Sequence, residues 1–315
     1  MKLQTQIPLQ PEKEQIDYNS KVLLLGSCFV ENIGAKLEYY KFQNLGNPFG
    51  IIFHPVAIEK LVKRAINKEK FTEKNIFFSN ENWHCFEVHS LIFAPEKEEF
   101  LKILNTKLEQ FREYLLAASH IIFTYGTAWV YRFKETDAIV ANCHKVPQKK
   151  FVKELLSVKE ICDAIDKTTT LIKSVNSNVA IITTVSPVRH LKDGFVENTL
   201  SKAHLISGLH EVKNSKNAIH YFPSYEVILD ELRDYRFYKE DMIHPNNTAI
   251  TIVWENFSEV WISAESKALQ KEIETIQNGL NHRPFNPESK EHKAFQVNLQ
   301  KRIENLKNLF SHITF

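Results

Sequence analysis

The feature that most constrains this fold is a short apolar segment, residues 21–25, that ends at Gly26 and leads directly into a helical pattern. Phe29, Ile33 and Leu37 recur there at the spacing of one helix face. An apolar run without polar alternation is typical of a strand covered on both faces, as in a parallel sheet. A strand, a tight glycine turn and a helix in this order predict the opening unit of a doubly wound α/β fold.

The same alternation recurs along the chain. Turn residues end three further apolar runs, at residues 121–125, 179–185 and 218–222. Helical patterns alternate with these runs and predict helices over residues 96–118, 158–175, 198–213 and 246–263. Since strands that alternate with helices form a mostly parallel sheet covered on both faces, we predict a three-layer α/β/α sandwich.

Two regions fall outside this alternation. Residues 75–93 alternate polar and apolar side chains, which predicts a β-hairpin inserted before the next sheet strand. Residues 264–315 are rich in Lys, Glu and Gln with apolar residues at helical spacing, which predicts one or two amphipathic helices that pack on the core or on a partner. We therefore expect one domain over residues 1–263 and a C-terminal helical extension over residues 264–315.

Composition narrows the class of protein. The chain has 315 residues and a formal net charge of +2 without a long Lys/Arg run, which argues against a nucleic-acid partner. No segment approaches the roughly 18 apolar residues of a membrane span, and the N-terminus lacks the pattern of a signal peptide, so we expect a cytoplasmic location. Four cysteines are too few for a disulfide framework, and we expect them to be reduced.

The turn after the first strand is a candidate site, because ligands bind beyond the carboxyl ends of the strands in an open parallel sheet. Ser27 and Cys28 follow Gly26 there, at the start of the predicted helix. Unpaired N–H groups at a helix N-terminus stabilise negative charge, so the turn can supply a nucleophile and part of an oxyanion hole. The same position is expected to lower the pKa of a cysteine thiol. A simpler interpretation makes Ser27 a helix cap and Cys28 a small buried residue.

A second motif lies just ahead of the last helix of the predicted domain. Asp241 precedes His244 by three residues, so that both side chains can face one side of a turn. The histidine can act as a general base, and the aspartate can orient it and stabilise the imidazolium. The simpler interpretation is a solvated acidic residue and a histidine at a helix start, with Pro245 in the first turn.

Both motifs belong to a series that resembles the GSCFA-domain family. Residues 26–30 read Gly-Ser-Cys-Phe-Val and differ from the family's signature in the last residue. Similar blocks follow in the same order at residues 47–50, 126–129, 142–145, 184–188 and 241–245. The resemblance implies membership of the SGNH-hydrolase superfamily, whose α/β/α sandwiches have a flavodoxin-like layout and are typically esterases or acyl hydrolases. It implies neither a cofactor nor a metal.

The resemblance also implies catalytic roles by position. His244 corresponds to the general base and Asp241 to its partner. The nucleophile of the superfamily lies two residues after a glycine, and the same count from Gly26 leads to Cys28. The serine in the superfamily's name points instead to Ser27, so both remain candidates, and the register favours Cys28.

One block departs from the superfamily. Its third block carries an asparagine that donates to the oxyanion, whereas residues 126–128 here read Gly-Thr-Ala. The candidates for oxyanion binding are Gly46, Asn47, Gly126 and Asn142. The candidates for contact with substrate are Trp129, His144, His89 and Arg189.

These motifs predict an acyl-ester hydrolase, or an acyltransferase, that acts on a small-molecule or saccharide acyl ester. The acceptor would be water or a sugar hydroxyl. The missing asparagine supports a second hypothesis, a non-catalytic carbohydrate- or nucleotide-binding module on the same scaffold.

Overall fold

The computed structural model describes residues 4–216 and 219–315. Its centre is a sheet of five parallel strands in the order β10-β9-β5-β1-β2. The strands are β1 (Lys21–Gly26), β2 (Gln43–Gly46), β5 (His120–Tyr125), β9 (Ala180–Val185) and β10 (His220–Tyr221). The predicted strands are confirmed as β1, β5, β9 and β10. Ala218, the predicted start of the last strand, lies outside the described residues.

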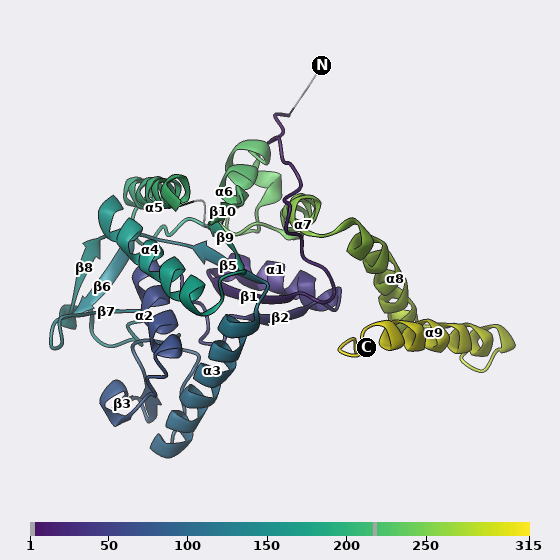
Figure 1. Cartoon of the computed structure of the whole chain (residues 1–315), viewed down its shortest axis with the longest axis horizontal. Coiled ribbons are helices and arrows are strands. Elements are labelled where there is room, and N and C mark those ends of the chain that lie inside the picture. Colours follow the sequence, from purple (N-terminus) through teal and green to yellow (C-terminus); the bar gives the residue numbers. More distant parts are fainter. Residues whose placement is uncertain (1–3, 217–218) are drawn as a thin grey trace.

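Helices cover both faces of this sheet, which confirms the predicted three-layer sandwich (Figure 1). One face carries α2 (Pro55–Ile66), α3 (Lys97–Ala117), α4 (Val158–Val175) and α5 (Phe195–Lys216). The other face carries α1 (Cys28–Tyr39) and α7 (Asn247–Trp261). Val227 and Ile228, which follow the short helix α6 (Ser224–Glu226), belong to the same core. The predicted helices therefore form within a few residues of their expected ends.

Alternation along each strand divides the apolar side chains between two cores. Leu23 and Leu25 of β1 pack with α2 to α5, while Val22 and Leu24 pack with α1 and α7. Successive side chains of a strand point to opposite faces, so an uninterrupted apolar run fills both cores at once. This is why residues 21–25 show no polar alternation.

The strand order fixes where a site can form. In chain order the sheet strands read 2-1-3-4-5, the flavodoxin-like order. The connections leave in opposite directions at β1 and β5, and a crevice opens there beyond the carboxyl ends of the strands. The turns after β1 and β5 lie at this switch point.

Two parts of the sheet structure were not predicted from the sequence. The edge strand β2 has a single large apolar residue, Leu45, and therefore shows no apolar run. A separate antiparallel sheet of β6 (Trp129–Phe133), β7 (Ala138–Val140) and β8 (Phe151–Leu155) follows β5. β6 and β8 mix charged and aromatic residues, and β7 has only three residues, so no clear period is visible in the sequence.

The inserted hairpin is confirmed over a shorter range than predicted. β3 (Phe77–Ser79) and β4 (Asn82–His84) pair in antiparallel fashion. Asn80 and Glu81 between them both have positive φ, as a tight two-residue hairpin turn requires. The remainder of the predicted range, up to residue 93, is irregular apart from a bridge between Trp83 and Ala94.

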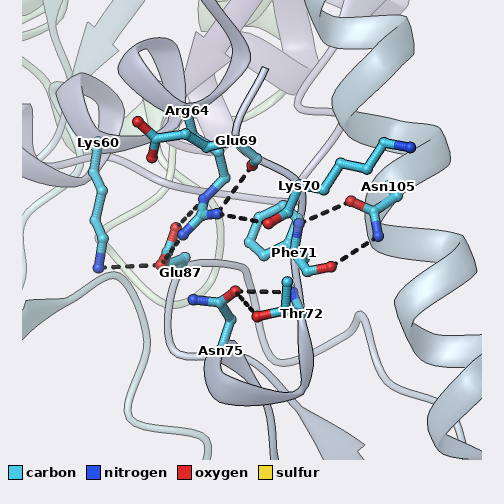
Figure 2. Close-up of polar contacts among 9 residues, drawn as sticks. All are labelled: Lys60, Arg64, Glu69, Lys70, Phe71, Thr72, Asn75, Glu87 and Asn105. Atoms are coloured by element: carbon cyan, nitrogen blue, oxygen red, sulfur yellow. Dashed lines mark hydrogen bonds and ion pairs between the residues drawn. The ribbon is translucent and has the colours of Figure 1, made fainter. Parts of the chain in front are cut away.

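A buried ion pair anchors the inserted region to α2 (Figure 2). The Arg64 guanidinium donates to both carboxylate oxygens of Glu87, each at 2.8 Å. It also donates to the carbonyls of Glu69 and Lys70 and lies 4.3 Å from the centre of the Phe71 ring. One side chain therefore fixes three points of the segment that leads to and follows the hairpin.

Two long helices form the C-terminal region, as predicted. α8 (Ala264–Asn281) and α9 (Lys290–Leu309) lie beyond α7 at one end of the molecule (Figure 1). Ile273 and Ile276 of α8 belong to the core of α1 and α7, and Phe310 after α9 contacts Tyr18 with ring centres 5.3 Å apart. None of the helices in the described residues is both long and apolar enough to cross a membrane.

Candidate active site

The turn after β1 requires glycine. Gly26 has φ +147°, and a Cβ added there would lie 2.3 Å from the Thr124 carbonyl oxygen of the neighbouring strand. The Gly26 N–H donates to Asn47 Oδ1 at 2.9 Å, which ties the turn after β1 to the turn after β2. The backbone can therefore leave the sheet sharply and begin α1 at Cys28.

Ser27 and Cys28 occupy different environments in this turn. Ser27 is only 3% exposed, and its hydroxyl caps α1 by accepting from the Phe29 N–H at 3.3 Å. Cys28 is half-buried and lines a cavity of about 160 Å³. The helix-cap interpretation of Ser27 thus describes its position, while the side chain of Cys28 reaches open space.

The expected fall in the thiol pKa is wrong. Burial raises the pKa of Cys28 above its ordinary value, and the nearby Glu31 carboxylate raises it further. The charges of Lys202 and Lys239 and a backbone hydrogen bond act in the opposite direction and are outweighed. The resting group is therefore a thiol, which needs a base before it can attack a carbonyl.

Asp241 and His244 form the pair that their spacing predicts. Asp241 Oδ2 lies 2.6 Å from His244 Nδ1, and Asp241 Oδ1 accepts from the N–H groups of Ile243 and His244, each at 2.9 Å. These hydrogen bonds lower the pKa of Asp241 to about 2. The carboxylate thus stays ionised at neutral pH and holds the histidine with Nε2 free to exchange protons.

Cys28 and His244 line the same cavity, although they are more than 200 residues apart in sequence. The remaining walls of this cavity include Glu31, Asn32 and Lys239. Among the described residues, no hydrogen bond joins the Cys28 thiol or the Ser27 hydroxyl to His244. Catalytic hydrogen bonds are often long before substrate binds, so the shared cavity is the informative observation.

A larger cavity lies on the other side of His244. It has a volume of about 480 Å³, and its walls include Phe53, Trp129 and Tyr131. Val188 and His244 belong to both cavities, so that the imidazole stands between a small compartment with the thiol and a larger one with aromatic walls. Such an arrangement can receive two unequal parts of one ligand.

Helix α5 holds the turns after β5 and β9 through a buried polar stripe. Ser201 Oγ lies 3.0 Å from Thr127 Oγ1 and accepts from the Ala128 N–H at 2.7 Å. Asn198 Oδ1 accepts from the His190 N–H at 2.9 Å. Both polar residues sit on one face of α5, because their spacing is three residues.

Lys202 completes this stripe. Its ammonium group is buried and donates to the carbonyls of Gly126 at 2.5 Å and Ser186 at 2.7 Å. Burial lowers the pKa of Lys202 to about 7, against an opposing effect of Cys28. The sequence offered a weak signal for this residue, since a single lysine among helical positions usually faces solvent.

The four oxyanion candidates are not gathered at one point. Asn47 joins the Gly26 turn, and its Nδ2 is a buried donor without a hydrogen-bond partner among the described residues. Gly46 is exposed at the end of β2, and the Gly126 carbonyl is held by Lys202. Asn142 lines the larger cavity, where its Oδ1 accepts from the His144 N–H.

The four substrate candidates also separate. Trp129 and Arg189 line the larger cavity. His144 is buried in the cluster with Phe77 and His84, and its Nε2 lies 3.0 Å from the Val88 carbonyl oxygen. His89 is packed against Gly50, where an added Cβ would lie 2.4 Å from the histidine Cβ. Neither histidine is among the residues that line the two cavities beside His244.

In the described residues, no group of three or more His, Cys, Asp or Glu side chains has an arrangement that could hold a metal ion.

Comparison with known families supports the motif series. The GSCFA family matches residues 21–257, three quarters of the chain. The chain belongs to the GSCFA family. The C-terminal domain of GSCFA domain proteins matches residues 273–315. This region includes the second half of α8 and all of α9.

A search of solved structures found a distant similarity. An acetyl xylan esterase from the rumen bacterium Butyrivibrio proteoclasticus is 9% identical to this GSCFA protein, with a TM-score of 0.39. The match covers 84% of this chain and 65% of the esterase. No curated protein matches this GSCFA protein in sequence.

Proposed function

We propose that this GSCFA protein is an acyl-ester hydrolase with Cys28 as nucleophile and His244 as general base. The observation that supports the proposal most is that Cys28 and His244 line a common cavity. Asp241 is hydrogen-bonded to His244 Nδ1, which leaves Nε2 for proton transfer. Nucleophile, base and orienting carboxylate are the three parts of a covalent acyl-transfer site. The resemblance to the SGNH superfamily assigns the same roles to Asp241 and His244.

The first half of the reaction forms an acyl-enzyme. His244 Nε2 takes the thiol proton as Cys28 Sγ bonds to the ester carbonyl carbon. The tetrahedral oxyanion then collapses, the carbon–oxygen bond to the alcohol breaks, and the imidazolium returns its proton to the departing alcohol. The ionised Asp241 stabilises the imidazolium in between.

The second half restores the thiol. His244 deprotonates a water molecule that attacks the thioester carbonyl, and the carbon–sulfur bond breaks. The acid is released, and the proton returns from the imidazolium to Cys28. A sugar hydroxyl in place of water would make the same site an acyltransferase.

Asn47 is our candidate for the missing oxyanion donor. Its Nδ2 lacks a partner, and its Oδ1 is fixed by the Gly26 N–H, so the amide is held beside the turn that carries Cys28. A preorganised amide donor contributes about 3 kcal/mol to the transition state in such sites. In this proposal, substrate binding brings Nδ2 to the oxyanion.

The two cavities suggest how an ester would lie. The compartment of about 160 Å³ beside Cys28 fits a short acyl group, and the compartment of about 480 Å³ with Trp129 and Tyr131 fits the alcohol part. Aromatic walls suit a sugar ring or another flat or cyclic alcohol. A cytoplasmic location remains a prediction from the sequence.

Hydrolysis of p-nitrophenyl acetate tests the proposal. Cys28→Ala and His244→Ala are each expected to lower kcat/KM by at least about 1,000-fold, because the residues act as a unit. Ser27→Ala is the matched control in the same turn. It removes a helix cap and is expected to lower the free energy of unfolding by about 1 kcal/mol while hydrolysis continues.

The opposite pattern would identify a different site. Hydrolysis lost in Ser27→Ala and retained in folded Cys28→Ala would transfer the role of nucleophile to Ser27. Wild-type protein that hydrolyses none of a series of short-chain esters would support the non-catalytic binding module.

A further inference from the structure

A third cavity lies on the Asp241 side of the loop that carries His244. It has a volume of about 580 Å³ and is lined by Arg189, Tyr225 and Tyr238. Ile243 lines both this cavity and the cavity of about 480 Å³ beside His244. Arg189 also lines both of these cavities. The guanidinium therefore stands next to the proposed active site, at the boundary between two open spaces.

Arg189 is half-buried and unpaired. Within the described residues, its guanidinium makes no hydrogen bond and no ion pair. The five N–H donors of an arginine form a planar fork that suits carboxylate and phosphate groups. A guanidinium that has lost part of its hydration without gaining a partner is a favourable place for an anion to bind.

The carboxylates around this cavity are already engaged. Asp241 is hydrogen-bonded to His244. An Asp230 carboxylate oxygen lies 3.7 Å from Arg233 Nη2, and an Asp234 carboxylate oxygen lies 3.5 Å from Arg236 Nε. Each of these carboxylates thus has a hydrogen-bond or ion-pair partner of its own, and none pairs with Arg189. The described lining carries three carboxylates and two guanidiniums, and Arg189 is the guanidinium there that no carboxylate neutralises.

Two phenol groups accompany the guanidinium. Tyr225 and Tyr238 are half-buried, and neither hydroxyl has a hydrogen-bond partner among the described residues. Burial raises the pKa of both phenols, and the charge of Arg189 acts on each in the opposite direction. Both hydroxyls therefore keep their protons at neutral pH and lie near enough to Arg189 to feel its charge.

We propose that Arg189, Tyr225 and Tyr238 bind an anionic group on the alcohol part of the substrate, a carboxylate or a phosphate. This proposal rests on the proposed esterase function, which it extends to a substrate class. The alcohol part occupies the cavity of Trp129, and its anion reaches past Arg189 into the third cavity. Guanidinium and phenol donors together would bind the oxygens of either anion.

Matched acetyl esters test this. The acetates of glycerol, glycerate and glycerol 3-phosphate share an acyl group and differ in the charge of the alcohol part. Wild-type kcat/KM is expected to be at least about tenfold higher for one or both anionic esters, the size of one charge-assisted hydrogen bond. The preferred ester distinguishes a carboxylate from a phosphate.

Variants assign the preference to the site. Arg189→Gln is expected to reduce the preference to near unity, because kcat/KM falls at least about tenfold more for the anionic esters than for acetylglycerol. Tyr225→Phe/Tyr238→Phe should reduce the preference in part. Arg233→Gln is the matched control, since its charge is already paired with Asp230. An equal loss on all three esters, or a preference that survives in Arg189→Gln, would overturn the proposal.

Direct binding separates this inference from the esterase proposal. If no ester is hydrolysed, calorimetric titration with inorganic phosphate and with succinate still measures the site. Wild-type protein is expected to bind at least one of them, and Arg189→Gln should bind it at least about tenfold more weakly. Equal binding by both proteins, or no binding by the wild type, would overturn the anion site.

Discussion

Single residues decide the turn that carries Cys28. Gly26 combines a positive φ with close approach to the Thr124 carbonyl, so glycine is needed there for two independent reasons. Gly46, which ends the neighbouring strand, has nothing within 4 Å of an added Cβ. The two glycines are therefore a matched pair for testing the turn.

We predict that Gly26→Ala lowers the free energy of unfolding by more than about 2 kcal/mol, because both strain and a backbone clash must be relieved. Gly46→Ala should change it by less than about 0.5 kcal/mol. Urea denaturation measures both. Similar values for the two variants would contradict the close approach at Gly26.

The buried ammonium group of Lys202 makes the free energy of unfolding depend on pH. Its pKa is lowered to about 7 in the folded protein, so between pH 7 and its ordinary pKa of 10.5 the unfolded chain binds the extra proton. Stability from this group therefore increases as the pH rises through that window.

We predict that wild-type unfolding free energy rises with pH relative to Lys202→Met, by up to about 1.4 kcal/mol per pH unit between pH 7 and pH 9.5. Urea titrations at several pH values measure the difference in slope. Parallel curves for the two proteins would show that the Lys202 ammonium is not destabilised by burial.

The sequence predicted part of the site at this scale. The three-residue spacing of Asp241 and His244 is local, and so is the pairing that it produces. The environment of Cys28 is not local, because burial, Lys202 and Lys239 reach it from other parts of the chain. The direction of its pKa shift could therefore not be inferred from a helix N-terminus alone.

At the scale of elements, contacts between segments far apart in the sequence could not be predicted. The helices and central strands could be predicted because each carries its own apolar period. β2 and the β6–β8 sheet could not, because their side chains are only partly buried and their pairing depends on neighbours. The Arg64–Glu87 pair likewise joins α2 to a segment 23 residues away.

We predict that Glu87→Gln lowers the free energy of unfolding by about 3 kcal/mol, because it leaves the buried Arg64 charge without its partner. Lys60→Met is the control on the same carboxylate. The Lys60 side chain is 43% exposed, and its loss should cost less than about 1 kcal/mol. Chemical denaturation distinguishes the two, and equal costs would contradict the central role of Arg64.

At the scale of the whole molecule, several of the described histidines are held as neutral rings by burial. Burial lowers the pKa of His54, His144 and His190 to about 4 in each case. Unfolding restores ordinary values near 6.5. The unfolded chain therefore binds more protons between these values, and the stability present above pH 6.5 is lost as the pH falls toward 4.

We predict that Tm falls steeply between pH 6.5 and pH 4.5, with up to about 1.4 kcal/mol lost per pH unit for each histidine. His144→Gln keeps a donor near the Val88 carbonyl. It removes one of the protons taken up on unfolding and should therefore reduce the dependence of stability on pH by up to about 1.4 kcal/mol per pH unit. Calorimetry at several pH values checks this. An unchanged slope would mean that His144 is not neutral when folded.

The architecture of the whole molecule was largely predictable, because an alternation of strands and helices permits few arrangements. The meeting of residues 28 and 244 follows from the same topology, since both lie beyond the carboxyl end of the sheet. The division of the site into three cavities was not predictable. It depends on the β6–β8 sheet and on loops whose positions are set by side chains of α5.

Mass spectrometry of the acid-quenched protein during turnover of p-nitrophenyl acetate tests the central claim most directly. A cysteine thioester is stable in acid, so an acyl-enzyme can be mapped to its residue. We predict one added acetyl group on Cys28, which accumulates in wild type and is absent from His244→Ala. Acetyl on Ser27, or labelling of Cys28 at the same rate without His244, would contradict a thiol nucleophile that the histidine activates.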